Sequence, residues 1–96
     1  MGPVRHVIEA YSKEITALAG RRHALSIRLF GSAARLDDGD ASDADFLVDF
    51  GPEASILDVV HLRLDLEHLL GFPVDVVPLG GLTTRDTHII EESIPV

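Results

Sequence analysis

Two short apolar segments joined by an acidic connection constrain the fold of this chain more than any other feature. The first segment, residues 25–30, ends at Gly31, and the second, residues 46–50, follows Asp43 and Asp45. Apolar runs of this length, bounded by glycine and polar residues, are typical of β-strands. The order predicts a strand, a turn whose backbone amides can hold an anion, and a second strand that begins at a pair of carboxylates.

Residues 4–19 carry apolar side chains at a helical period, which predicts an amphipathic helix at the start of the chain. Pro3 occupies a first-turn position, where the missing N–H is tolerated, and Gly20 is the expected end of the helix. Arg21 and Arg22 suit the C-terminal end of a helix, and a solvated helix exit is the simplest interpretation of them.

Residues 55–70 give the clearest helical pattern of the chain. Ser55 and Asp58 have the spacing of a capping box, and Gly71 is placed to end the helix. The expected buried stripe consists of Ile56, Val59, Val60, Leu62, Leu66, Leu69 and Leu70.

The remaining chain predicts one more strand and one more helix. Residues 74–77, with Asp75 among valines, form the expected third strand, and a final helix should run from Thr83 or Thr84 to about Glu92. Helices and strands in this order predict an α/β (α+β) fold with a small mixed sheet flanked by helices. At 96 residues we expect one domain, residues 1–96.

Composition excludes several classes of function. The chain has no cysteine, which excludes disulfides and thiolate metal sites, and its formal net charge of -8 disfavours direct binding to a nucleic-acid backbone. No apolar run approaches the roughly 18 residues of a membrane span, so we expect no membrane partner and a cytoplasmic location.

Three carboxylates stand out from the acidic background. Asp43 and Asp45 are two positions apart at a strand entrance, so both side chains leave an extended backbone on the same side. Asp75 interrupts an apolar strand. If that strand lies beside the strand that begins at Asp43 and Asp45, the three carboxylates converge at one place. Such hard oxygen ligands suit Mg²⁺ or Mn²⁺ together with substrate phosphates. The competing interpretation is that these residues lie on solvated strand faces, since 16 of 96 residues are acidic.

A calcium loop is the main alternative metal site. Counted from Asp38, Asp40, Ser42 and Asp49 also fall at ligand positions of an EF-hand loop. However, Asp43 stands where the loop needs glycine, and both flanking segments predict strands rather than helices. We therefore reject the EF-hand. The five histidines show no adjacent motif and are not assigned to a metal.

The motif residues together resemble the minimal nucleotidyltransferases of the DNA polymerase beta superfamily. Their pattern is a strand, Gly-Ser, an arginine three residues later, Ser-Asp-x-Asp before a second strand, and a later aspartate. The matching residues are Gly31, Ser32, Arg35, Ser42, Asp43, Asp45 and Asp75. The resemblance implies a polymerase beta-like nucleotidyltransferase fold. The short chain is similar to antitoxins whose partner is a helical HEPN-domain ribonuclease toxin.

The resemblance also implies an activity. It is Mg²⁺-dependent transfer of AMP from ATP to a tyrosine hydroxyl of the cognate HEPN toxin, within a hetero-oligomer, with release of pyrophosphate. Asp43, Asp45 and Asp75 would be the catalytic and metal-binding residues, with two Mg²⁺ ions expected and Mn²⁺ as a substitute. The residues that would bind the nucleotide are Gly31, Ser32, Arg35 and Ser42.

One departure from the family pattern leaves alternatives open. Leu36 stands where the family commonly has glycine, and an acidic stretch follows it. Leucine adopts a positive φ only with strain, so the loop could differ in shape. The alternative function is an inactive antitoxin that neutralises its toxin by binding alone. Transfer to a small molecule or nucleic acid is a weaker third hypothesis.

Overall fold

The computed structural model describes residues 3–31, 44–81 and 87–96. Its elements follow one another as α1 (Pro3–Ala10), α2 (Ser12–Arg21), β1 (Ala24–Phe30), β2 (Ala44–Phe50), α4 (Ile56–Leu70), β3 (Val74–Pro78), η1 (Leu79–Gly81), α5 (Thr87–Glu92) and β4 (Ile94–Pro95). This is the small mixed α/β architecture that the sequence predicts. Among the described residues, no helix is long and apolar enough to cross a membrane.

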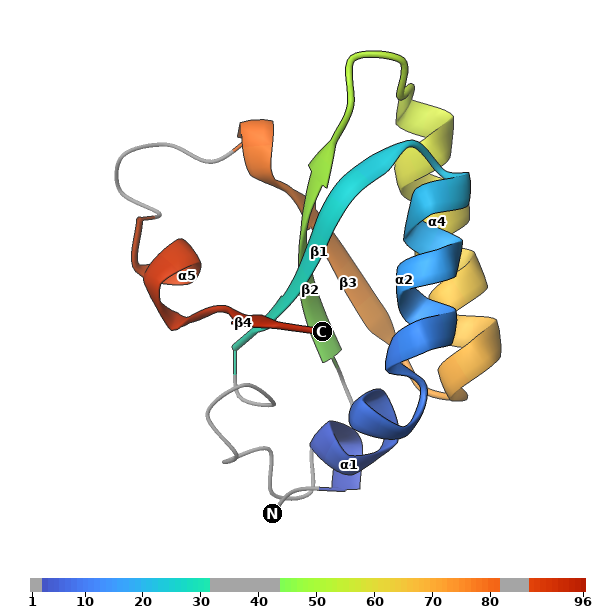
Figure 1. Cartoon of the computed structure of the whole chain (residues 1–96), viewed down its shortest axis with the longest axis vertical. Helices are drawn as coiled ribbons and strands as arrows, with labels where there is room; N and C mark the ends of the chain where they lie inside the picture. The colour runs from blue at the N-terminus through green and yellow to red at the C-terminus, as the bar shows by residue number, and fades with distance from the viewer. Residues whose placement is uncertain (1–2, 32–43, 82–86) are drawn as a thin grey trace.

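The four strands form one mixed sheet in the order β3-β2-β1-β4. β1 runs antiparallel to both β2 and β4, whereas β2 and β3 are parallel and are connected through α4. Helices α2 and α4 cover one side of the sheet, and α5 lies on the other side (Figure 1). The sheet therefore has one face beneath the two long helices and one face that is more open.

The core lies between the sheet and the two long helices. Alternate residues of β2 face it, and Ala44, Phe46 and Val48 are fully buried there. From the helix side, Leu62 and Leu66 of α4 are also fully buried. Each such leucine stabilises the fold by about 1.5–3 kcal/mol relative to an exposed position. Because alternate residues of a strand point to opposite sides, the same packing directs Asp45 to the open face.

α4 follows the predicted capping signals. The backbone N–H of Ser55 donates to Asp58 Oδ2 at 2.9 Å, and Gly71 ends the helix with a φ of 83°. A cap of this kind is worth about 1 kcal/mol. The predicted stripe was wrong for Ile56 and Val60, which are exposed, because the core contacts the row of Leu62, Leu66 and Leu70 instead.

The predicted helix at the start of the chain is two helices in the structure. Tyr11 separates α1 from α2, and its N–H donates to both Val7 O (3.1 Å) and Ile8 O (3.2 Å). This bend lets Ile8 of α1 join the core reached by Ile15 of α2. The apolar period is kept on both sides of a bend, so it could not reveal the break.

Gly20 was predicted to end that helix and does not. It lies within α2, which ends at Arg21, and the left-handed residue beyond the helix is His23, with a φ of 66°. Arg22 is the C-cap, and it is more than a solvated exit because its Nε bonds Asp65 Oδ2 at 2.8 Å. A tertiary ion pair to α4 therefore fixes the direction in which the chain leaves α2.

Candidate active site

Gly31 forms the turn at the end of β1 and is the tightest backbone position of the site. Its φ is 77°, a conformation that side chains disfavour. A Cβ placed on Gly31 would lie 2.5 Å from Asp45 Oδ2 and 3.4 Å from Asp45 Cγ. Glycine is therefore required twice, for the backbone conformation and for the space that the Asp45 carboxylate occupies.

Asp45 and Asp75 are direct neighbours across the parallel pair β2 and β3. Their Cα atoms are register partners, so both side chains leave the sheet on the same face. Asp45 is half-buried beside the Gly31 turn, whereas Asp75 is exposed on the edge strand. The structure thus brings two carboxylates and one glycine turn to a single corner of the open face.

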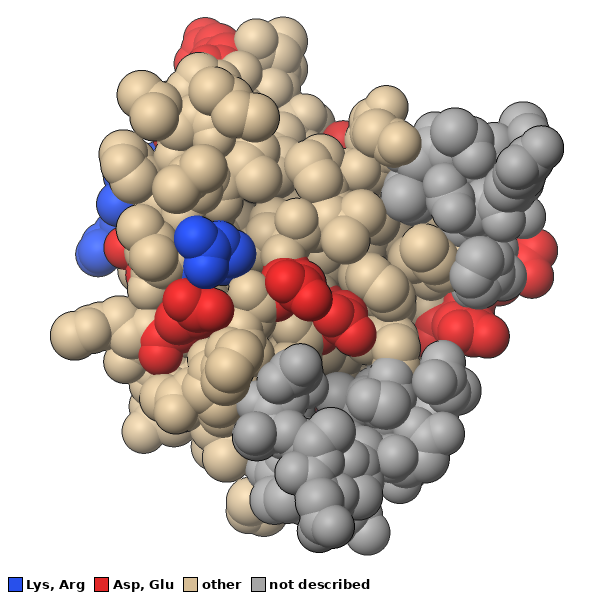
Figure 2. Space-filling model, turned by 180° about the vertical axis from the view of Figure 1, so that it is seen from behind, with Lys and Arg blue, Asp and Glu red and all other residues tan. Residues whose placement is uncertain are grey.

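Figure 2 views the molecule from behind. In this rear view, acidic side chains gather across the middle and to the right, close to the residues drawn in grey. Carboxylates placed together repel one another unless a cation lies among them. An acidic concentration in a chain of net charge -8 therefore favours a cation rather than a bare anion as the first ligand.

The open face also holds an arginine that sequence reasoning did not single out. Arg28, in the middle of β1, donates from Nε to Ser93 Oγ at 2.8 Å and from a terminal nitrogen to Ser93 O at 2.9 Å. Ser93 Oγ in turn donates to Ile90 O at 2.6 Å. These bonds fasten the end of α5 and β4 to the open face. An arginine within an apolar strand was the signal available in the sequence.

Three of the predicted site residues lie in the described part, and the structure brings them together: Gly31, Asp45 and Asp75. The others lie outside the described residues: Ser32, Arg35, Ser42 and Asp43. Leu36 and the acidic stretch after it also lie outside them. Within residues 3–31, 44–81 and 87–96, no group of three His, Cys, Asp or Glu side chains could hold a metal. Asp45 and Asp75 are two oxygen donors of the kind a hard divalent cation prefers, and Asp43 is the candidate third.

The resolved pKa shifts belong to the helix side of the molecule rather than to this corner. The Ser55 N–H holds the pKa of Asp58 below its ordinary value, and His23 adds to the effect. The hydrogen bond from Arg22 to Asp65 raises the pKa of that guanidinium. The Asp58 shift arises mainly at the N-terminus of α4, and the Arg22 shift arises from the ion pair between the end of α2 and α4, so neither involves the candidate site.

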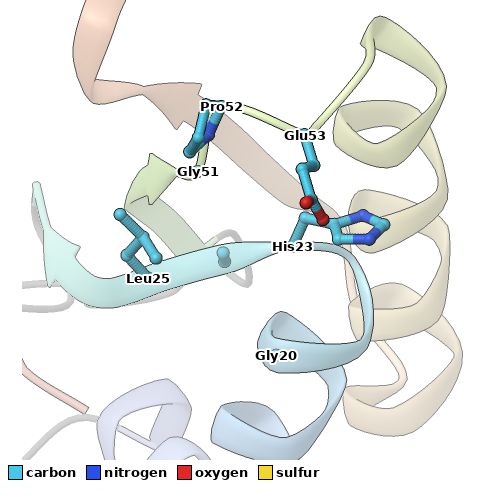
Figure 3. Close-up of a pocket in the computed structure, with 7 residues that line it drawn as sticks. Gly20, His23, Leu25, Gly51, Pro52 and Glu53 are labelled. Carbon is cyan, nitrogen blue, oxygen red and sulfur yellow. The ribbon is translucent and has the colours of Figure 1, made fainter.

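A hollow of about 350 Å³ lies at the opposite end of β1 and β2 from the two carboxylates. Figure 3 shows the residues around it, and the His23 and Glu53 side chains extend toward the same side. The lining residues are Gly20, His23, Ala24, Leu25, Gly51, Pro52 and Glu53. It does not contain Asp45 or Asp75 and is not part of the candidate site.

The fold and the site together define the class of protein. Residues 13–95 match the family described as polymerase beta nucleotidyltransferase, and this chain belongs to that family. It is a nucleotidyltransferase. A solved structure described as a "putative minimal nucleotidyltransferase" is 36% identical, with a TM-score of 0.86 over 96% of this chain and 95% of that one.

Two of the relatives with similar sequences are named protein adenylyltransferases. The chain is 49% identical to "Putative protein adenylyltransferase MJ0435" of Methanocaldococcus jannaschii, over 71% of this chain and 74% of that one. It is 38% identical to the protein adenylyltransferase MntA of Thermococcus cleftensis, over 82% of this chain and 77% of that one. A structure of a toxin-antitoxin pair, MntA-HpeT, shares the fold at 22% identity, with a TM-score of 0.69 over 88% of this chain and 69% of that one.

Proposed function

We propose that this nucleotidyltransferase is an antitoxin that transfers AMP from ATP to a tyrosine hydroxyl of a cognate HEPN-domain ribonuclease toxin. The observation that carries the proposal is the Gly31 turn held against Asp45, with Asp75 in register beside it. Relatives named protein adenylyltransferase and a related toxin-antitoxin structure support the acceptor class. Since ATP is a cytoplasmic substrate, the proposal places the reaction in the cytoplasm.

The proposed transfer exchanges one phosphorus–oxygen bond for another. The phenolic oxygen bonds to the α-phosphorus of ATP, and the bond from that phosphorus to the bridging oxygen breaks. Pyrophosphate leaves with the bonding electrons, and the phenolic proton passes to Asp75 and then to water. Asp75 suits the acceptor side because it is exposed on the edge strand, where another protein can approach.

Asp43, Asp45 and Asp75 are the proposed ligands for Mg²⁺, with two ions expected. When bound, the metal would neutralise phosphate charge and favour the ionised acceptor oxygen. The Gly31 backbone lies directly against the Asp45 carboxylate, and in this proposal that contact positions the carboxylate before substrate arrives. Such preorganisation lowers the cost of reaching the transition state.

The nucleotide would lie along the Gly31 turn. In this proposal Ser32 and Ser42 hydrogen-bond the triphosphate, and Arg35 pairs with its charge. A positive-φ glycine lets the backbone approach a phosphate closely, and consecutive backbone amides form an anion site. The acidic chain could then hold an acidic substrate through the metal and the amides, without a basic groove.

Intact-mass measurement of the cognate toxin after incubation with MgATP tests the proposal. We expect the toxin to gain whole AMP units with the unaltered chain, and a chelator to prevent the gain. Asp45→Asn should reduce the rate by at least roughly 100-fold, the usual cost of losing a group that stabilises transition-state charge. Asp49→Asn is the matched control, since Asp49 lies on the same strand and face, four residues further along.

The binding-only alternative gives a different result in the same experiment. An unchanged toxin mass together with blocked ribonuclease activity would overturn the transfer reaction and leave the antitoxin role intact. Transfer to nucleic acid or to a small molecule would label that acceptor and not the toxin.

A further inference from the structure

Strand β3 begins shortly after α4 ends, and its second residue is Asp75. The Ala44 N–H of β2 donates to Pro73 O at 3.2 Å. The C=O and N–H of a trans peptide point in opposite directions, so the Val74 N–H of the same peptide points away from β2. In the described part of the chain β3 is an outer strand, with no further strand to accept this N–H. The first peptide of β3 therefore needs a partner from outside the sheet.

Glu67 of α4 is that partner. Its Oε2 accepts from the Val74 N–H at 3.0 Å, and its Oε1 accepts from Arg63, one turn earlier, at 3.3 Å. The Glu67 side chain is 29% exposed, so its carboxylate is partly withdrawn from water. The peptide that begins β3 is thus held from both sides, by β2 through Pro73 O and by α4 through Glu67.

The position of Glu67 on α4 is unfavourable for a carboxylate. The Glu67 C=O accepts from the N–H of the C-cap residue Gly71 at 2.8 Å, so Glu67 lies in the last turn of the helix. The C-terminal end of a helix carries partial negative charge and favours cations over anions. The helix dipole therefore favours a neutral residue here, and the bond to β3 is what the glutamate adds.

We propose that Glu67 is a positioning residue for Asp75, an inference that rests on the proposed transfer of AMP. Asp75 follows Val74 directly, and its Cα is the register partner of the Asp45 Cα. By fixing the peptide before Asp75, Glu67 sets the direction in which the Asp75 carboxylate leaves the strand. α4 covers the other face of the sheet from the candidate site, so Glu67 acts through the backbone and touches no substrate (Figure 1).

Other contacts keep β3 in the sheet when Glu67 is replaced. Val74 is 3% exposed and packs in the core, and the bond from Ala44 to Pro73 does not involve Glu67. Because β3 lies at the edge, water can bond to the Val74 N–H in place of the carboxylate. Loss of the Glu67 bond should therefore loosen the start of β3 without unfolding the domain. Displacement of a catalytic group by about 1 Å can lower a rate roughly 100-fold, so the reaction is more sensitive to this change than the fold is.

Two uncharged substitutions isolate the hydrogen bond. Glu67→Gln keeps an oxygen that can accept from the Val74 N–H, whereas Glu67→Met has similar length and only a weak acceptor. Both residues resemble glutamate in helix propensity. We expect Glu67→Met to lower kcat for AMP transfer to the toxin about tenfold per folded molecule, and Glu67→Gln to keep the original rate. The KM for ATP should not change, because the proposed triphosphate contacts lie at the Gly31 turn.

Amide hydrogen exchange of the full chain, followed by NMR, gives a readout that does not depend on activity. Successive N–H groups of a strand point to opposite sides, so the Asp75 N–H faces β2 and is protected while β3 stays paired. We expect the Asp75 amide to exchange about fivefold faster in Glu67→Met than in the unaltered chain, the equivalent of one net hydrogen bond. Glu67→Gln should keep the slower exchange.

Asp65→Leu is the matched control. Asp65 is a carboxylate on the same helix whose side chain is also 29% exposed, and it pairs with Arg22 rather than with β3. Its replacement should lower stability in urea and leave both kcat and Asp75 exchange unchanged. Glu67→Asp is a second variant, which keeps the charge but is one methylene shorter. We expect it to behave as Glu67→Met does, so the test remains decisive if Glu67→Met fails to fold.

The proposal is overturned if Glu67→Met and Glu67→Asp keep both the original kcat and the original Asp75 exchange. It is also overturned if Glu67→Gln is as impaired as Glu67→Met, since the charge and not the hydrogen bond would then matter. The same losses in Asp65→Leu would assign the effect to the stability of α4 and would equally count against it. If the unaltered chain transfers no AMP, the proposed function fails, and Asp75 exchange alone then decides whether Glu67 holds the start of β3.

Discussion

Gly31 and Gly71 have nearly the same backbone conformation, with φ angles of 77° and 83°. Their surroundings are opposite. A Cβ on Gly31 would lie 2.5 Å from a carboxylate oxygen of Asp45, whereas a Cβ on Gly71 would have nothing within 4 Å. At Gly71 glycine serves only the end of α4. At Gly31, glycine also leaves space for the Asp45 carboxylate. Glycine at Gly71 is therefore a requirement of folding, and glycine at Gly31 is also a requirement of the site.

Gly31→Ala should have the largest effect of any glycine substitution among residues 3–31, 44–81 and 87–96. The left-handed conformation costs alanine about 1–2 kcal/mol, and the new methyl group must displace the Asp45 carboxylate. We expect transfer to fall by roughly 100-fold or more, as when a preorganised group is lost. The AMP-transfer assay, with urea unfolding in parallel, measures both effects.

Gly71→Ala should cost similar backbone energy, about 1–2 kcal/mol, and leave the rate of transfer per folded molecule unchanged. Asparagine tolerates the left-handed region, so Gly71→Asn should regain most of the stability. Gly31→Asn should not regain activity, because its Cβ meets the same carboxylate. If Gly31→Asn were active, space beside Asp45 would not be the reason for glycine at that position.

Gly20 extends the comparison of Gly31 with Gly71 to a glycine that needs neither a left-handed backbone nor space for a neighbour. Gly20 lies inside α2 without a positive φ, and its Cβ would meet nothing within 4 Å. Alanine should therefore stabilise the protein, by about 0.5–1 kcal/mol, because it restricts the unfolded chain and favours the helix. Thermal unfolding should show a higher midpoint, and a lower midpoint would contradict a helical position for Gly20.

The smallest expected effect is a change in the pH dependence of stability. The folded pKa of Asp58 lies below its unfolded value of about 3.9, because the carboxylate accepts from Ser55 N–H. Asp58 therefore stabilises the fold above that pH, and the contribution is lost as pH falls through about 3.9 toward the folded pKa. Asp58→Asn should flatten this part of the unfolding profile. Lys13→Gln, at an exposed position of α2, is a control that should leave the slope as it is.

Much of the fold could be predicted because its signals are local. Ser55, Asp58 and Gly71 bound α4 by contacts made within a few residues, and the three longer strands were found by composition. The sequence predicted that Asp45 and Asp75 meet only if their strands are adjacent, and the parallel pairing of β2 with β3 meets that condition. The sequence could therefore suggest the candidate acids, because aspartates beside or within short apolar strands stand out from their neighbours.

The features that could not be predicted depend on tertiary contacts. α4 is apolar around most of its surface, so its period could not decide whether Leu62 or Val60 faces the core. The bend at Tyr11 depends on how α1 and α2 pack in the folded domain. The hydrogen bonds from Arg28 to Ser93 likewise form only when distant parts of the chain come together. The short β4 was likewise missed, since a two-residue strand carries no period.

The strand order has a consequence for aggregation. The two outer strands, β3 and β4, are the short ones, and each contains a proline, Pro78 and Pro95. Proline has no N–H to offer an added strand, and a charged residue such as exposed Asp75 discourages one. The carboxylate proposed to serve the acceptor thus also protects the sheet edge from joining another molecule. We expect Asp75→Asn to scatter more light than Asp45→Asn during prolonged incubation, and equal scattering would assign the protection to the prolines alone.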